Sequence, residues 1–185
     1  RQRQMCIRDR LYVQHYYLRH NEEPKNRASF YIIRNAGSLL ENDDQDGLAH
    51  FLEHMAFQGT KNFPGKGIIT TLEKYGVAFG RNINAYTAHN ETVYNLSSVP
   101  TNDPSLLDTC VLILHDWSYC LTLDDQEIDN ERGVISEEWR TRRTSGFRMQ
   151  KQMFPVLFKG SQYAIRDVIG SLAVSYTHLR AHETR

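Results

Sequence analysis

The sequence lacks features that define several large classes of protein. It has three cysteines in 185 residues, at positions 6, 110 and 120, and none of them forms a Cys-x-x-Cys pair. This odd number and spacing argue against a disulfide framework and against a cysteine zinc site, and Cys110, in an apolar helical stretch, is predicted to be a buried thiol. Because no apolar run approaches about 18 residues, no membrane span is predicted.

A net charge is also lacking, since 22 basic and 22 acidic residues balance at neutral pH. Domains that bind nucleic acid usually carry a basic excess. The arginines at positions 140, 142 and 143 are therefore predicted to form the basic end of a helix rather than a nucleic-acid patch. A hydrophobic content of 40% at this length supports one domain with its own core.

What the sequence does contain is a group of metal-binding side chains at residues 50–54, which read His-Phe-Leu-Glu-His. On a helix, His50 and His54 lie one turn apart on the same face, where they can share a metal ion. Glu53 lies beside them and can reach a water molecule on that ion. This order is the inverted form of the His-Glu-x-x-His motif of zinc peptidases.

The surrounding sequence favours a metal over a chance pattern. His50, Glu53 and His54 are the only polar side chains in the apolar run that extends to residue 57, which predicts a buried helix, and the polar stretch 39–47 before it offers N-capping residues. Buried imidazoles and carboxylates are costly without partners, and one zinc ion with its water would satisfy all three. The alternative is a pair of hydrogen-bonded histidines in the core.

A third zinc ligand must come from elsewhere, because a catalytic zinc usually has three protein ligands and an open position for water. The segment 124–140 is predicted to be a helix with an acidic first turn and a basic end, and Glu131 and Glu138, seven residues apart, share one of its faces. Gly133 inside it costs about 1 kcal/mol relative to alanine and predicts a close packing contact. The apolar stripe of this helix consists of Ile128, Val134, Ile135 and Trp139. The alternative to a metal-binding role is that the glutamates form a solvated acidic face.

Three segments together resemble the insulinase/pitrilysin family of zinc peptidases. They are residues 47–61, which include the histidine motif, the Asn-Ala-Tyr-Thr at 84–87, and the Glu-Arg-Gly-Val-Ile-Ser-Glu-Glu at 131–138. The similarity runs from about residue 11 to residue 172 and is greatest to large bacterial members.

The resemblance implies a role for each residue of the motifs. His50, His54 and Glu138 are expected to bind one Zn²⁺, with Glu131 as a supporting carboxylate. Glu53 is expected to act as the general base that takes a proton from the attacking water.

Substrate binding is expected at a predicted hairpin, residues 81–98, whose β-branched and aromatic residues alternate around a polar turn. An exposed strand edge near the zinc could bind a peptide by adding it to the sheet. The resemblance implies that Asn84 and Ala85 then lie near the scissile bond. An ordinary core hairpin is the alternative.

The predicted fold is α+β, a mainly antiparallel sheet with helices packed on one face. The resemblance implies the mitochondrial-processing-peptidase-like metallohydrolase fold in truncated form. Strands are predicted at 11–19, at 27–36 and in the hairpin, and helices at 47–57, 67–75, 104–120, 125–143 and 147–157.

Residues 11–172 are predicted to be an N-terminal catalytic domain that is incomplete at its C-terminal end, and residues 1–10 and 173–185 are predicted to be non-native tails. The resemblance implies that homologous peptidase-family domains pair with such a domain to enclose a peptide substrate, so weak or no activity is expected of the chain alone. It also makes the periplasm or cell envelope the expected location. A non-catalytic scaffold of the same fold is the alternative function.

Overall fold

The computed structural model describes residues 2–9 and 12–171. The strands are β1 (Gln2–Asp9), β2 (Tyr12–Arg19), β3 (Arg27–Arg34), β4 (Ile83–Thr87) and β5 (Thr92–Pro100). The helices are α1 (Leu48–Met55), α2 (Gly67–Glu73), α3 (Pro104–Tyr119), α4 (Asp125–Thr141) and α5 (Ser145–Leu157), and three short 3-10 helices cover Ser38–Leu40, Asp43–Gln45 and Gln162–Ala164. Among the described residues, none of these helices has both the length and the apolar composition needed to cross a bilayer.

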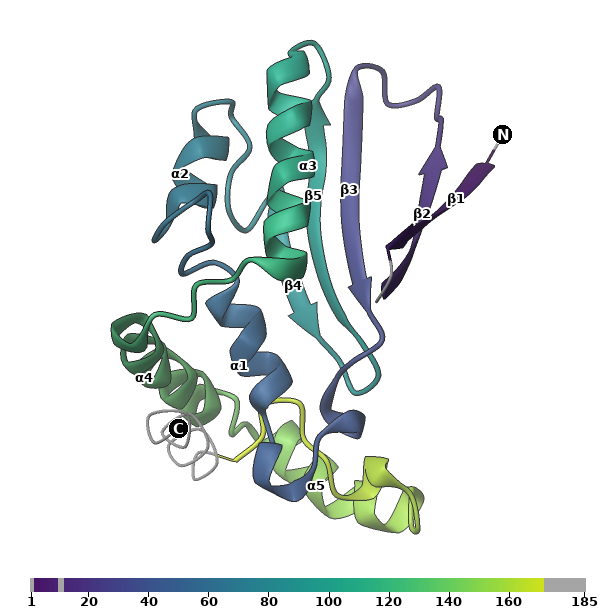
Figure 1. Ribbon diagram of the computed structural model, residues 1–185. Helices are drawn as coiled ribbons and strands as arrows, with labels where there is room; N and C mark the ends of the chain where they lie inside the picture. The colour runs from purple at the N-terminus through teal and green to yellow at the C-terminus, as the bar shows by residue number, and fades with distance from the viewer. Residues whose placement is uncertain (1, 10–11, 172–185) are drawn as a thin grey trace.

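The main sheet is antiparallel, with strands in the order β3-β5-β4. Helices α1 and α3 lie against one of its faces (Figure 1). Along β3 the side chains alternate between the two faces: Phe30 and Ile32 pack on the core, whereas Tyr31 and Ile33 are exposed on the opposite face. The predicted α+β fold, with an antiparallel sheet and helices on one face, is therefore confirmed.

The core lies between this sheet and the helices α2 and α3. Its fully buried side chains include Leu96 and Val99 from β5, Ile68 and Leu72 from α2, and Leu106, Cys110 and Ile113 from α3. Helix α3 begins at Pro104 after Asp103, whose carboxylate accepts a hydrogen bond from the Ser105 N–H, so the sequence provides a local helix start. The prediction of a buried thiol at position 110 is confirmed.

At the N-terminus, β1 pairs with β2 in a separate two-stranded antiparallel sheet. The strand predicted at 11–19 is thus present as β2. A strand at Gln2–Asp9 is compatible with a native or a foreign origin of residues 1–10, so their assignment as a non-native tail stays a prediction. The tail predicted at 173–185 lies outside the described residues.

A buried carboxylate joins the loop after α1 to helix α3. Asp116 is fully buried, and its Oδ2 accepts hydrogen bonds from the Thr60 hydroxyl at 2.7 Å and the Asn62 backbone N–H at 2.9 Å. Its Oδ1 accepts another from the Asn62 side chain at 2.8 Å. Burial alone would raise the pKa of Asp116, but these hydrogen bonds outweigh it and lower the pKa below its usual value.

We expect Asp116→Asn to destabilise the fold by about 3 kcal/mol at neutral pH, because an amide group would face donors that now meet an anion. The pKa of Asp116 is lower in the folded protein than in the unfolded chain, where it is about 3.9, so its ionised form stabilises the fold at any pH above that unfolded pKa. This stabilisation is lost as the pH falls through the pKa of the folded protein. The difference between the two proteins should therefore shrink in acid. Urea unfolding at pH 7 and pH 3 measures both effects, with the exposed Asp108→Asn on the same helix as the control. Equal midpoints for the two variants at pH 7 would contradict the expectation.

Candidate metal centre

Helix α1 carries the histidine motif and lies between α4 and β4 (Figure 1). His50 and Glu53 are 4% and 8% exposed, so the expected burial is confirmed for these two side chains, whereas the His54 side chain is 20% exposed. The expectation of burial on all sides is wrong at Leu52, which is 42% exposed.

Helix α4 brings the second set of acidic side chains to α1. Asp124 caps it by accepting hydrogen bonds from the N–H groups of Gln126 and Glu127. Ile135 is buried against Phe51 and Met55, and this small apolar cluster docks α4 on α1. Docking through these residues turns Glu131 and Glu138 toward the histidines.

Two expectations for α4 are wrong. Val134, placed in the apolar stripe, is 51% exposed because it lies on the side of the helix away from α1. Gly133 is exposed, and a Cβ atom built there would meet nothing within 4 Å, so no close packing contact explains this glycine.

Three donor atoms converge between the two helices. The Glu138 Oε2 lies 3.3 Å from the His54 Nε2 and 3.6 Å from the His50 Nε2, and the rings of His50 and His54 stand 4.7 Å apart between centroids. With bonds of about 2.1 Å, two ligands of a tetrahedral zinc are about 3.4 Å apart. The residues present therefore fit a zinc ion in spacing and in donor type.

Glu131 holds the opposite side of the His54 ring. Its Oε1 lies 2.7 Å from the His54 Nδ1, and its Oε2 accepts a hydrogen bond from the Gln58 amide at 2.6 Å. An Nδ1–H donated to Glu131 leaves the Nε2 lone pair free for a metal, the usual arrangement of a metal-binding histidine. The structure thus separates the two glutamates, with Glu138 on the Nε2 side and Glu131 on the Nδ1 side.

The three donor side chains differ in the direction of their pKa shifts, because their surroundings differ. Burial lowers the pKa of His50 to about 4, aided by the neighbouring His54. Burial also opposes a charge on His54, but hydrogen bonds to Glu131 and Glu138 outweigh it and raise the pKa to about 9. The hydrogen bond from His54 is the main cause that holds the pKa of Glu138 at about 2. A proton on His54 thus occupies the place that a metal ion could take.

Glu53 lies next to this group and is held by the sheet. Its Oε2 accepts a hydrogen bond of 2.6 Å from the Thr87 hydroxyl, at the end of β4. Burial raises the pKa of Glu53, and the hydrogen bond from Thr87 opposes that rise. Asn84 and Ala85 lie earlier on β4, opposite Asn95 and Tyr94 of β5. Both are half-buried, and Ala85 packs against the core.

Sequence reasoning gave no role to three residues that contact the site. Thr87 bonds Glu53, Gln58 bonds Glu131, and Arg142 forms an ion pair with Glu138 at 2.7 Å. Only Arg142 had a local signal for its contact, since it follows Glu138 by four residues on the same helix. The bonds from Thr87 and Gln58 each join two distant segments of the chain and had no such signal.

A His-x-x-Glu-His helix that faces a glutamate of a later helix defines the class of metallopeptidases with the inverted zinc motif. The chain belongs to the insulinase family, peptidase family M16: its residues 16–153 match the family described as Insulinase (Peptidase family M16).

Individual relatives agree with this membership. The probable zinc protease PqqL of Haemophilus influenzae is 40% identical over 162 residues, which are 88% of this chain and 17% of the relative. The first half of the periplasmic protease PqqL from Escherichia coli superposes with a TM-score of 0.84 at 37% identity, over 92% of this chain and 37% of that one. Cytochrome b-c1 complex subunit 1 of Bos taurus is 34% identical over 60% of this chain and 21% of its own length. The chain thus spans about a sixth of the length of the PqqL relative.

Proposed function

We propose that this chain is the zinc-binding part of a metalloendopeptidase that hydrolyses peptides or unfolded polypeptides. The convergence of His50 Nε2, His54 Nε2 and Glu138 Oε2, with the Glu53 carboxylate beside them, carries the proposal. Membership in a peptidase family supports it. The alternative of a non-catalytic scaffold is not favoured, because a scaffold has no need for these four side chains to stand together.

The chemistry divides among the residues of the site. His50, His54 and Glu138 would hold the zinc, which when bound supplies a Lewis acid that polarises the peptide carbonyl and acidifies a water molecule. Glu53 would accept the proton of the attacking water at its carboxylate and later deliver it to the leaving amine. Glu131 would keep the proton of His54 on Nδ1, and Gln58 and Arg142 hold the two acidic side chains in place.

The edge of the main sheet offers a place for the substrate. Strand β4 is the last strand on its side of the three-stranded sheet formed by the described residues, and its end at Thr87 touches Glu53. A peptide that added to this edge as a further strand would run toward the general base. This arrangement supports Asn84 and Ala85 as residues that bind the substrate near the scissile bond.

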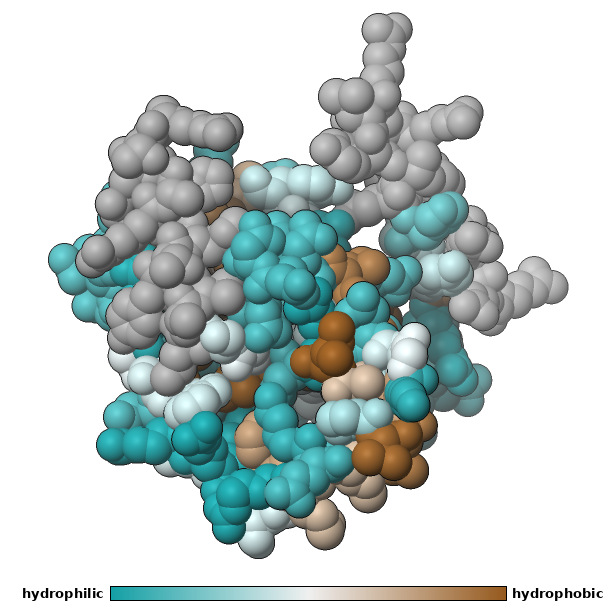
Figure 2. Space-filling view, turned by 90° about the horizontal axis from the view of Figure 1, so that it is seen from below, coloured by the Kyte–Doolittle hydropathy of each residue, from teal (hydrophilic) through white to brown (hydrophobic). Residues whose placement is uncertain are grey.

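Further domains of the same family are proposed to cover this one. Exposed apolar side chains lie on α5, among them Met149, Val156 and Leu157. Figure 2 shows the face of the molecule that points down in Figure 1. This face is mainly hydrophilic, with hydrophobic side chains in separate groups. Such groups suit contact with another domain. The periplasm or cell envelope is proposed as the location, on the similarity to a periplasmic protease.

His54→Ala tests the metal site directly. We expect the unaltered chain to carry about one zinc by elemental analysis and this variant to carry almost none, because a ligand and its bond to Glu138 are both lost. His115→Ala is the matched control, because His115, Asp116 and Cys120 form the other group of potential ligands among the described residues. Zinc retained by His54→Ala, or lost equally in both variants, would contradict the proposed site. Absence of zinc from the unaltered chain would favour the scaffold.

A further inference from the structure

Helix α1 begins without a cap of its own. The residue at its N-cap is Gly47, with φ of 94°, and no side chain there can bond the first turn. The first N–H groups of a helix have no partner within the helix. Here the Glu41 side chain, which precedes the helix, acts as the cap. Its Oε2 accepts a hydrogen bond from the Gly47 N–H at 2.8 Å, and its Oε1 accepts a hydrogen bond from the Ala49 N–H at 2.7 Å. A carboxylate at this end also suits the helix dipole.

A second segment crosses the same point of the chain. A Cβ atom on Gly170 would lie 2.3 Å from the Gly47 Cα and 2.4 Å from the Asp46 carbonyl oxygen, so the two backbones touch directly. The Ser171 N–H donates a hydrogen bond to that same oxygen at 3.3 Å. The start of α1 is therefore held between Glu41 and the segment 163–171, which we call the strap.

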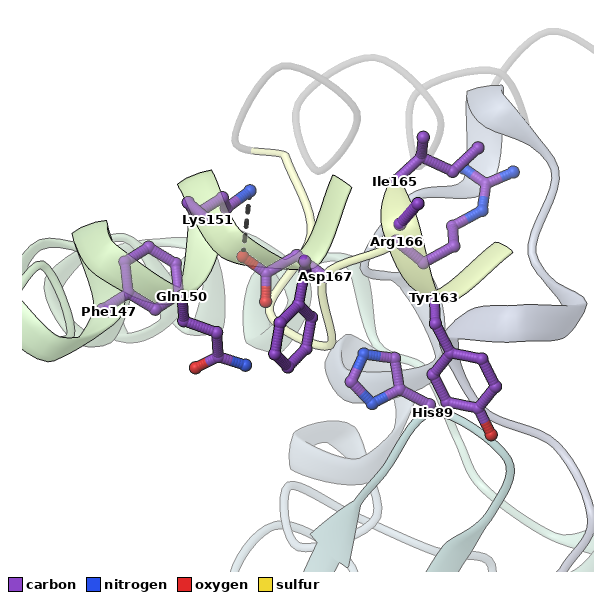
Figure 3. A pocket seen from close by; sticks show the side chains of 10 residues that line it. His89, Phe147, Gln150, Lys151, Tyr163, Ile165, Arg166 and Asp167 are labelled. Atoms are coloured by element: carbon purple, nitrogen blue, oxygen red, sulfur yellow. Dashed lines mark ion pairs between the residues drawn. The ribbon is translucent and has the colours of Figure 1, made fainter. Parts of the chain in front are cut away.

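The strap is itself fixed at several points. Arg166 donates a hydrogen bond of 2.8 Å to Asp43, the first residue of the 3-10 helix before α1. Figure 3 shows the Lys151 ammonium group of α5 directed at the Asp167 carboxylate, 3.1 Å away. The ring of Tyr163 stands 5.2 Å from that of His89 in the β4–β5 turn. The strap is thus tied to α5, to the β4–β5 turn and to the 3-10 helix before α1.

The two histidines of the motif are held in different ways. Glu131 fixes the His54 ring through Nδ1. The His50 Nδ1 is buried and has no hydrogen-bond partner within residues 2–9 and 12–171. His50 is the third residue of α1 and follows Ala49, so its orientation depends on the backbone of the first turn, which Glu41 holds.

We propose that Glu41 is a positioning residue for the metal centre: by capping α1 it fixes His50 relative to Glu138, as Glu131 fixes His54. This inference rests on the proposed zinc site. A loosened first turn would move one of the three ligands while the other two keep their places.

Glu41→Gln tests this role, because glutamine keeps the size and one acceptor but directs an NH₂ group at an amide N–H. We expect zinc affinity, measured by competition with a chromophoric chelator, to fall roughly tenfold, the lower end of the range for residues that orient metal ligands. The visible spectrum of the Co²⁺-loaded chain should change as well, because the geometry around the ion changes. In the metal-free chain, NMR hydrogen exchange of the Gly47 and Ala49 amides should become faster.

Asp103→Ala is the control, because it removes the side-chain cap of α3, which carries none of the proposed ligands. It should lower the melting temperature but leave the zinc affinity within about twofold and the Co²⁺ spectrum unchanged. Unaltered zinc affinity and Co²⁺ spectrum in Glu41→Gln would overturn the positioning role alone, and so would unchanged amide exchange. Failure of the unaltered chain to bind zinc would overturn the proposed function as well.

Discussion

Glu53→Gln is expected to keep the zinc and to lower peptide hydrolysis by roughly 10³-fold, within the range found for the loss of a general base. The glutamine amide can still accept the hydrogen bond from Thr87, so the local structure should persist. It cannot take a proton from the attacking water. The measurement is kcat/KM for an unstructured peptide in the full-length protein that contains this domain, together with zinc content by elemental analysis.

The control for this substitution is Glu73→Gln, which changes an exposed carboxylate at the end of α2. It should leave both hydrolysis and zinc content unchanged. Loss of the zinc in Glu53→Gln would reassign Glu53 as a ligand. Full activity in that variant would remove it from the proposed chemistry.

The sequence predicted most elements because their signals are local. The apolar stretch of α3, the acidic first turn of α4 and the polar turn between β4 and β5 each lie within one short segment. The histidine spacing likewise predicted that two imidazoles share a face, as they do on α1. The pairing of Glu138 with His54 needed the family resemblance, because nothing local relates two segments so far apart.

Contacts between distant segments could not be predicted in the same way. Polar residues before α1 indicated a cap, but that cap comes from Glu41, separated from the helix by a 3-10 turn at Asp43–Gln45. The approach of Gly170 to Gly47 depends on the path of the chain after α5, which no pattern in either segment encodes. Val134 was misassigned for a related reason: the apolar cluster between α1 and α4 includes Ile135 and Ile128 of α4, and Val134 lies outside it and is exposed.

Replacement of Glu138 should weaken zinc binding more than replacement of Glu131. Zinc sites bind with roughly 10 kcal/mol or more at neutral pH, so each of three protein ligands accounts for about 3 kcal/mol, or at least about a hundredfold in affinity. Glu138→Gln removes an anionic donor on the Nε2 side of both histidines and should show this loss. Glu131→Gln keeps an oxygen that can accept the His54 Nδ1–H, so about a tenfold loss is expected.

A zinc competition titration of both variants tests this order, with Glu137→Gln as the control on the same helix. Glu137 is exposed and forms its ion pair with Arg140, away from the histidines, so its replacement should leave zinc affinity unchanged. A larger loss in Glu131→Gln than in Glu138→Gln would exchange the two roles and make Glu131 the ligand. Equal small losses in both would mean that the metal is held by the histidines without either carboxylate, which the 3.3 Å approach of Glu138 to His54 argues against.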